Sequence, residues 1–115
     1  MNGYWDGPKP EPQARTIDEM REVLADPGCT FDQPLYFMYR DLAKNESDRA
    51  WLRQQHIRYD ITVIPAATLC GEHVKTMGHY HTLNPAGVFY PEIYEVISGT
   101  GHYLLQTEDA GDVVM

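Results

Sequence analysis

Residues 76–81 carry the sequence TMGHYH, and residues 90–96 carry YPEIYEV. On an extended chain, residues two positions apart point to the same side, so His79 and His81 are predicted to face one side together. Two imidazoles at this spacing can occupy neighbouring positions on one metal ion. The pair therefore predicts a metal site, and the alternative is a pair of ordinary surface or core histidines.

A third ligand has to come from a neighbouring strand, and Glu92 is the candidate because it opens the next predicted strand, residues 92–98. In that strand Glu92 and Tyr94 share one face, whereas Glu95 lies on the other. Two histidines and one carboxylate suit a divalent transition metal that keeps open positions for a substrate. Gly78, directly before His79, is expected to permit a close approach of the backbone.

The remaining pattern predicts many short strands separated by turns. Strands are predicted at residues 34–41, 56–64, 74–81, 92–98 and 102–106, with a further strand beginning at residue 113. A capping box at residues 16–19 predicts a helix that ends at residues 26–28, and residues 45–55 are predicted to form a short helical turn or loop. This succession favours a β-sandwich or barrel over a helical fold.

The ends of the chain differ from its middle. Residues 1–15 contain several prolines and no periodicity, so they are predicted to be an arm without regular structure. Residues 1–33 are accordingly expected to form this arm and a short helix, and residues 34–115 the β-rich body. The abrupt apolar ending, residues 113–115, is expected to mark a fragment of a longer chain.

Composition excludes several classes of protein. The 115 residues contain 17 acidic and 9 basic side chains, a formal net charge of -8, which argues against a nucleic-acid partner. No apolar run approaches the length of a membrane span. Cys29 and Cys70 form no CxxC pattern and are predicted to be reduced thiols of a cytoplasmic protein.

The order Gly-His-x-His, then Glu92, then Gly99 resembles the first motif of the cupin superfamily. Ten residues separate His81 from Glu92 where the family usually has only a few, so a loop insertion is expected. Residues 35–41, 58–65 and 99–106 also look like segments of the cupin-type phosphoglucose (glucose-6-phosphate) isomerases of archaea. The resemblance covers about residues 35 to 107.

This resemblance implies a mainly β fold, a small cupin (jelly-roll) β-barrel with a catalytic metal inside, and a homodimer. It implies that His79, His81 and Glu92 hold a divalent metal, Fe, Mn, Ni or Zn, with Fe favoured. The family's second motif, which supplies a fourth ligand, lies beyond Met115. Residues 34–115 are therefore expected to be the N-terminal part of the barrel, with the C-terminal part absent.

The resemblance also implies the reversible interconversion of glucose 6-phosphate and fructose 6-phosphate in glycolysis and gluconeogenesis. Glu92 and Tyr94 would be the catalytic residues. The sugar phosphate would be held by Thr62, Thr76, Gly78 and Tyr39. The alternative for the threonines is an ordinary place in a strand, and for Tyr94 it is core packing.

Two other functions fit the same motif. One is another metal-dependent cupin enzyme, such as a dioxygenase, which uses the same ligand set with positions left free for oxygen. The other is a non-catalytic sugar-binding cupin fragment. Neither a nucleic acid nor a membrane is expected as a partner.

Overall fold

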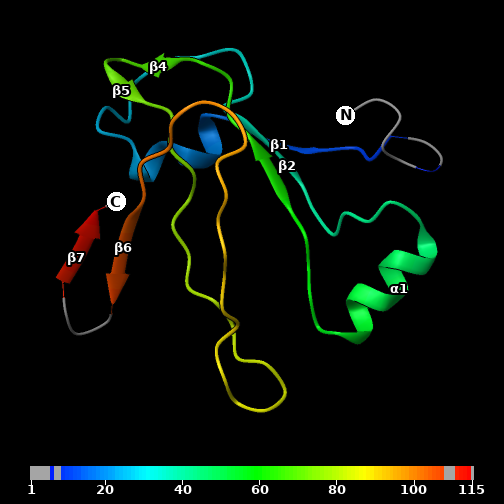
Figure 1. The fold of residues 1–115 in the computed structure, drawn as a ribbon. Helices are drawn as coiled ribbons and strands as arrows, with labels where there is room; N and C mark the ends of the chain where they lie inside the picture. The colour runs from blue at the N-terminus through cyan, green and yellow to red at the C-terminus, as the bar shows by residue number, and fades with distance from the viewer. Residues whose placement is uncertain (1–5, 7–8, 108–110, 115) are drawn as a thin grey trace. The chain divides into compact units, whose positions relative to one another are not determined.

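The structure is a computed structural model that describes residue 6, residues 9–107 and residues 111–114. The chain divides into two compact units, Met1–Gly78 and His79–Met115. The first unit contains, in order, β1 (Gln13–Arg15), η1 (Asp18–Val23), β2 (Tyr36–Tyr39), α1 (Glu46–Gln54), β3 (Ile61–Val63), β4 (Thr68–Leu69) and β5 (Glu72–His73) (Figure 1). The second contains β6 (Leu104–Thr107) and β7 (Gly111–Val114).

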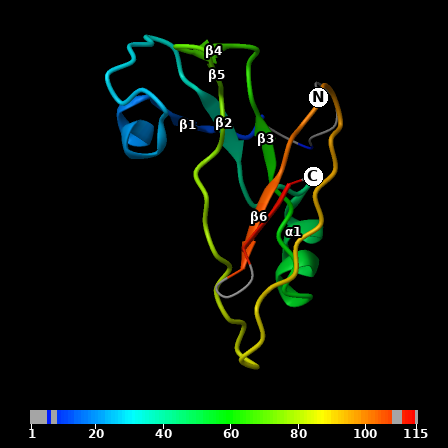
Figure 2. The same ribbon diagram turned by 90° about the vertical axis from the view of Figure 1, so that its left-hand side faces the viewer.

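The largest sheet of the first unit has three antiparallel strands in the order β1-β2-β3 (Figure 2). The strand predicted at residues 34–41 is confirmed as β2, and it pairs Phe37 with Ala14 on one side and Met38 with Thr62 on the other. The prediction of an arm without structure up to residue 15 is wrong at its end, because β1 gives β2 its second partner. The strand predicted at residues 56–64 is present only as β3.

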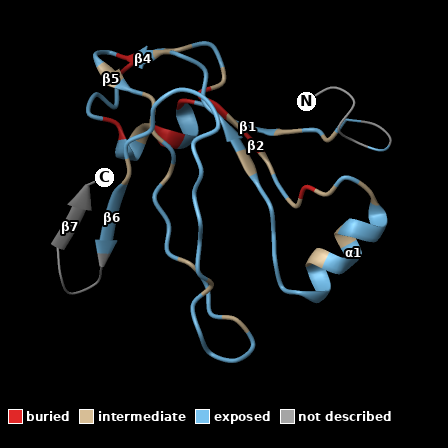
Figure 3. Ribbon diagram, viewed as in Figure 1, coloured by how far each residue is buried: buried red, intermediate tan, exposed pale blue. Residues whose placement is uncertain are grey.

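A small core lies between β2, η1 and the β4–β5 hairpin (Figure 3). Tyr36 is 2% exposed and Met20 is fully buried, and the Tyr36 hydroxyl lies 3.8 Å from the Met20 sulfur. The same hydroxyl accepts a 3.2 Å hydrogen bond from the backbone amide of Met77, so this buried polar group is satisfied. The core cluster consists of Ile17, Met20, Leu24, Cys29, Leu35, Tyr36, Met38 and Leu69.

The capping box at the start of η1 is formed in a different way from the prediction. The Glu19 carboxylate accepts from the Thr16 amide at 3.0 Å, as expected. However, the Thr16 hydroxyl donates to that same carboxylate and does not accept from the Glu19 amide. The element is a six-residue 3₁₀ helix that ends at Val23, before the residues predicted to stop it. Six residues is long for a 3₁₀ helix, since most run for only three or four residues.

The helical turn predicted at residues 45–55 is confirmed as α1. The Asn45 side chain accepts from the Asp48 amide at 2.8 Å and caps the helix. The helix is tied to the end of β2 by Asp41, whose carboxylate lies 2.7 Å from Arg53 and 3.2 Å from Arg49. The sequence predicts Trp51 and Leu52 as the apolar anchor of this segment, but Trp51 is 56% exposed and Leu52 is only half-buried.

The β4–β5 hairpin carries a covalent link. Its two-residue turn, Cys70-Gly71, has φ values of 51° and 90°, the double left-handed conformation of tight hairpin turns. Cys70 forms a disulfide with Cys29, so the prediction of two reduced thiols is wrong. The Cα atoms lie 6.0 Å apart because Cys29 and Leu69, next to Cys70, both belong to the core cluster.

The second unit contains fewer strands than the sequence predicts. Residues 74–81 and 92–98 are not in strands, and β6 pairs with β7, not with residues 92–98. The sequence also predicts a hairpin in which residues 102–106 pair back through Gly99-Thr100-Gly101, and this is wrong because residues 92–98 form no strand. In the described ranges the sheets stay separate and antiparallel, and no closed barrel is present. Within them, no helix combines the length and the apolar character of a membrane span.

The disulfide is expected to be present in protein purified without reductant. In denaturant, a thiol reagent should detect no free thiol before reduction and two after it. Because the bond closes a loop with a sequence separation of 41, its reduction should lower the free energy of unfolding by up to about 4 kcal/mol. Two free thiols in the untreated protein would show that the bond does not form.

Asp41 is expected to stabilise the fold in a pH-dependent way. The hydrogen bond from Arg53 and the charges of Arg53 and Arg49 lower the pKa of its carboxyl below the ordinary 3.8. In Asp41→Asn, the asparagine tolerates the local φ of 54°, as the aspartate does, but it carries no charge. The variant should lose on the order of 1 kcal/mol at neutral pH. This deficit should disappear as the pH falls below 3.8, because the parent carboxyl then becomes protonated.

Asp32→Asn is the matched control for Asp41→Asn, because Asp32 is exposed. Urea unfolding at a series of pH values measures both variants. A deficit of Asp41→Asn that stays constant down to pH 2 would contradict the assignment.

Candidate metal centre

A compact turn closes the long loop between His81 and Glu92. The Asn84 side-chain oxygen accepts from the amides of Ala86 and Val88 at 2.9 and 3.0 Å. Gly87 adopts a φ of 78°, which glycine tolerates without strain, and its amide donates to the Asn84 carbonyl. Leu83 and Phe89 then form a β-bridge. The two arms of the loop therefore run side by side, and the turn brings the end of the loop back beside its beginning.

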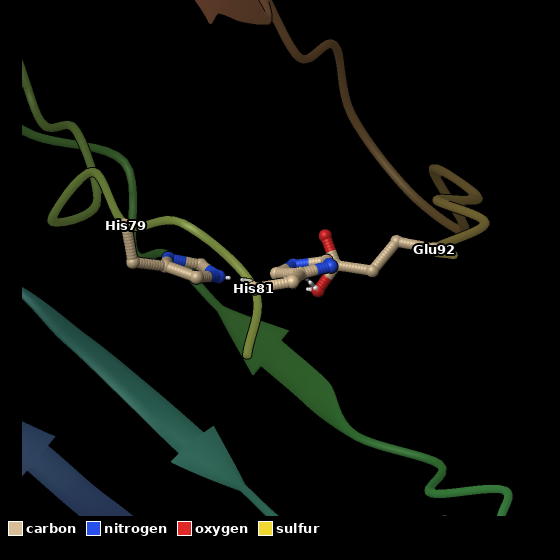
Figure 4. Close-up of side chains that lie close together, drawn as sticks. All are labelled: His79, His81 and Glu92. Atoms are coloured by element: carbon tan, nitrogen blue, oxygen red, sulfur yellow. Dashed lines mark ion pairs between the residues drawn. The ribbon is translucent and has the colours of Figure 1, made fainter. Parts of the chain in front are cut away.

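This turn brings three donor side chains together (Figure 4). His79, His81 and Glu92 each offer one ligand atom, and these atoms all lie within 4.8 Å of one another. Nε2 of His81 lies 2.5 Å from Oε1 of Glu92, and Nε2 of His79 lies 3.9 Å from the same oxygen. The two imidazoles stack with their centroids 5.4 Å apart. They face one side together, as predicted, although no strand holds them.

The His81 ring is oriented by the backbone across the loop. Its Nδ1 lies 2.8 Å from the carbonyl oxygen of Tyr90, which can only accept a hydrogen bond. A hydrogen bond there requires a proton on Nδ1, and Nε2 is then the ring atom that faces Glu92. Metal-binding histidines commonly donate a hydrogen bond from the N–H of their second ring nitrogen to a carbonyl or carboxylate in this way. No pattern of residues indicated this contact in advance, because it depends on the closed turn.

Glu92 is held at both oxygens. Oε1 faces the imidazoles, and Oε2 accepts a short hydrogen bond from the Tyr94 hydroxyl. Partial burial of the phenol, together with the hydrogen bond to Glu92, raises the pKa of Tyr94 to about 12. Tyr94 therefore stays protonated near neutral pH and can act as a donor. The predicted shared face of Glu92 and Tyr94 agrees with this contact.

The donor set fits a divalent transition metal. Atoms bound to one ion at about 2.1 Å lie about 3 Å apart at right angles and at most about 4.2 Å apart. Donors within 4.8 Å need only small movements to reach these separations. Two imidazole nitrogens and one carboxylate oxygen are the ligands that iron, manganese, nickel and zinc accept in proteins. Three protein ligands leave open positions for water or a substrate oxygen.

The residues assigned to the sugar phosphate all belong to the first unit. Thr62 is exposed in β3, and Tyr39 is half-buried in β2, opposite Ile61. Thr76 and Gly78 are exposed in the irregular segment after β5. A Cβ at Gly78 would meet nothing within 4 Å, so the close backbone approach expected there is not seen. Glu95 is not part of the donor cluster.

Comparison with known proteins identifies the family. The family model described as glucose-6-phosphate isomerase matches residues 14–115. No curated protein and no solved structure matches the chain. The match spans nearly the whole chain and includes all three donors of the centre, and the motifs around them are those of the cupin-type enzymes. The protein belongs to the cupin-type glucose-6-phosphate isomerase family, a family of isomerases.

Proposed function

We propose that this protein is a metal-dependent isomerase that interconverts glucose 6-phosphate and fructose 6-phosphate. The observation that carries the proposal is the meeting of His79, His81 and Glu92 in a chain of this family. These residues would hold a divalent metal, Fe, Mn, Ni or Zn, with Fe favoured by the resemblance. The orientation of His81 by the Tyr90 carbonyl supports a ligand role, because it presents Nε2 to the centre.

The bound metal would supply a positive charge that polarises the substrate oxygens on C1 and C2. Side chains and backbone groups of the chain itself would transfer the proton and hold the substrate. Glu92 is the proposed base that moves a proton between C1 and C2, and Tyr94 orients its carboxylate through the hydrogen bond to Oε2. The hydroxyls of Thr62 and Thr76 and the amide of Gly78 are proposed to donate to the phosphate, with Tyr39 lining the sugar.

We further propose the assembly that the family resemblance implies. Residues 34–115 would be the N-terminal part of a cupin barrel in a cytoplasmic homodimer. Apolar exposure supports a larger assembly: Ile93 is 98% exposed and Ile97 is 72% exposed. Apolar side chains left in water at this level are typical of surfaces that another part of a fold or another subunit covers.

His81→Ala is expected to weaken metal binding by at least tenfold. Loss of a direct ligand should cost no less than the 10- to 100-fold known for changes around ligands. Calorimetric titration of the metal-free full-length protein with Co²⁺ measures the dissociation constant. His102→Ala is the control, because His102 is exposed in the same unit and lies outside the donor cluster. Equal affinities of parent and His81→Ala would refute the ligand assignment.

Glu92→Gln is expected to lower kcat for the isomerisation by roughly 10²- to 10⁴-fold, the contribution of a general base. The amide keeps the shape of the side chain but loses its basicity. The measurement is a coupled assay of fructose 6-phosphate conversion by the full-length protein.

Glu95→Gln is the control for Glu92→Gln, since it removes a neighbouring carboxylate that lies outside the donor cluster. If both variants lose activity equally, the role of Glu92 as base is wrong. Fe(II)-dependent oxygen uptake by a parent protein that lacks isomerase activity would point to a dioxygenase instead.

A further inference from the structure

We propose that Tyr103 is a positioning residue for the metal centre, acting on Glu92 through Tyr94. This inference deepens the proposed function and rests on it. The Tyr103 and Tyr94 rings have their centroids 5.3 Å apart and are tilted by 53°. The Tyr94 hydroxyl in turn donates to Glu92, the carboxylate of the centre. One aromatic contact and one hydrogen bond therefore connect Tyr103 to the donor cluster.

The backbone around Tyr103 is built for this contact. Gly99 adopts a φ of 82° and reverses the chain after residues 92–98. A Cβ at Gly101 would lie 3.4 Å from both the Tyr103 ring and the Val96 side chain, at the lower limit of ordinary van der Waals contact. Gly101 therefore leaves room for the returning segment, in which the Tyr103 ring lies against Tyr94.

Tyr94 needs such support because the rest of its surroundings restrain it little. It is 57% exposed, and residues 91–100 are all exposed. A tyrosine in this environment can rotate its ring into water and release Glu92. Tilted aromatic pairs at this separation have a favourable geometry beyond simple burial. The half-buried ring of Tyr103 therefore favours the rotamer of Tyr94 that reaches Oε2 of Glu92.

Tyr103 contacts Tyr94, and Tyr94 contacts Glu92, so the proposed effect of Tyr103 on the centre passes through Tyr94. This route separates a positioning role from general stability. If Tyr103 acts only through Tyr94, its replacement should have no further effect once Tyr94 can no longer donate to Glu92. Residues that act through one shared partner are non-additive in this manner.

The experiment measures the Co²⁺ dissociation constant of the full-length protein by calorimetry, without reference to activity. The variants are Tyr103→Leu, Tyr103→Phe, Tyr94→Phe and the double variant Tyr94→Phe/Tyr103→Leu. Tyr59→Leu is the matched control, because it removes an exposed tyrosine of the first unit. Urea unfolding of each variant shows whether it is folded. If Tyr103→Leu does not fold, Tyr103→Phe still tests this position, because it keeps the aromatic ring.

The proposal predicts that Tyr103→Leu weakens Co²⁺ binding about two- to tenfold, the range of an aromatic pair. Tyr103→Phe and Tyr59→Leu should bind as the parent does. In the Tyr94→Phe background, Tyr103→Leu should add nothing. Parent-like binding by folded Tyr103→Leu, weakened binding by folded Tyr103→Phe, or additive effects of the two positions would overturn it.

Failure of the proposed function would look different. A parent protein that binds no Co²⁺ would refute the metal centre, and this inference with it, before any variant is compared. A parent that binds Co²⁺ without isomerase activity would refute only the reaction, and the comparison of variants would still decide the role of Tyr103.

Discussion

The burial of Tyr36 against Met20 holds the first unit together. Every buried side chain in the described ranges lies between residues 17 and 69, and all of them except Leu42 belong to the cluster around these two. The Tyr36 hydroxyl also reaches the amide of Met77, so the core fixes the segment that leads into the donor histidines. Burial of apolar surface is the main favourable term in folding. Here it acts within the first unit, while hydrogen bonds shape the donor cluster of the second.

The geometry of the centre is largely local. Asn84 and Gly87 close the loop, and the bridge between Leu83 and Phe89 aligns its arms. Contacts of short sequence separation form with a small loss of chain entropy. A site assembled in this way needs no large core around it. If the proposed metal binds, it would also contribute to the stability of the second unit, because it would join both arms of the loop.

Local chemistry was predictable from sequence, and long-range pairing was not. The donor pair could be anticipated because the spacing of His79 and His81 itself places both side chains on one side. The loop could be anticipated because Asn84 and Gly87 are residue types that favour turns. The partner of β6 could not, because alternation shows which residues can form a strand but not which neighbour they choose. The Cys29–Cys70 disulfide was missed for a similar reason, since neither cysteine has a local pattern that indicates pairing over 41 positions.

The carbonyl that orients His81 belongs to the residue before Pro91. A proline restricts the preceding residue to extended backbone angles, so the direction of the Tyr90 carbonyl is limited before the chain folds. The next residue after the proline is Glu92 itself. A single tripeptide thus supplies both the carboxylate of Glu92 and the carbonyl that orients the imidazole of His81. A change in the length of the turn at Asn84 would leave this local link intact, provided that Tyr90, Pro91 and Glu92 stay consecutive in the chain.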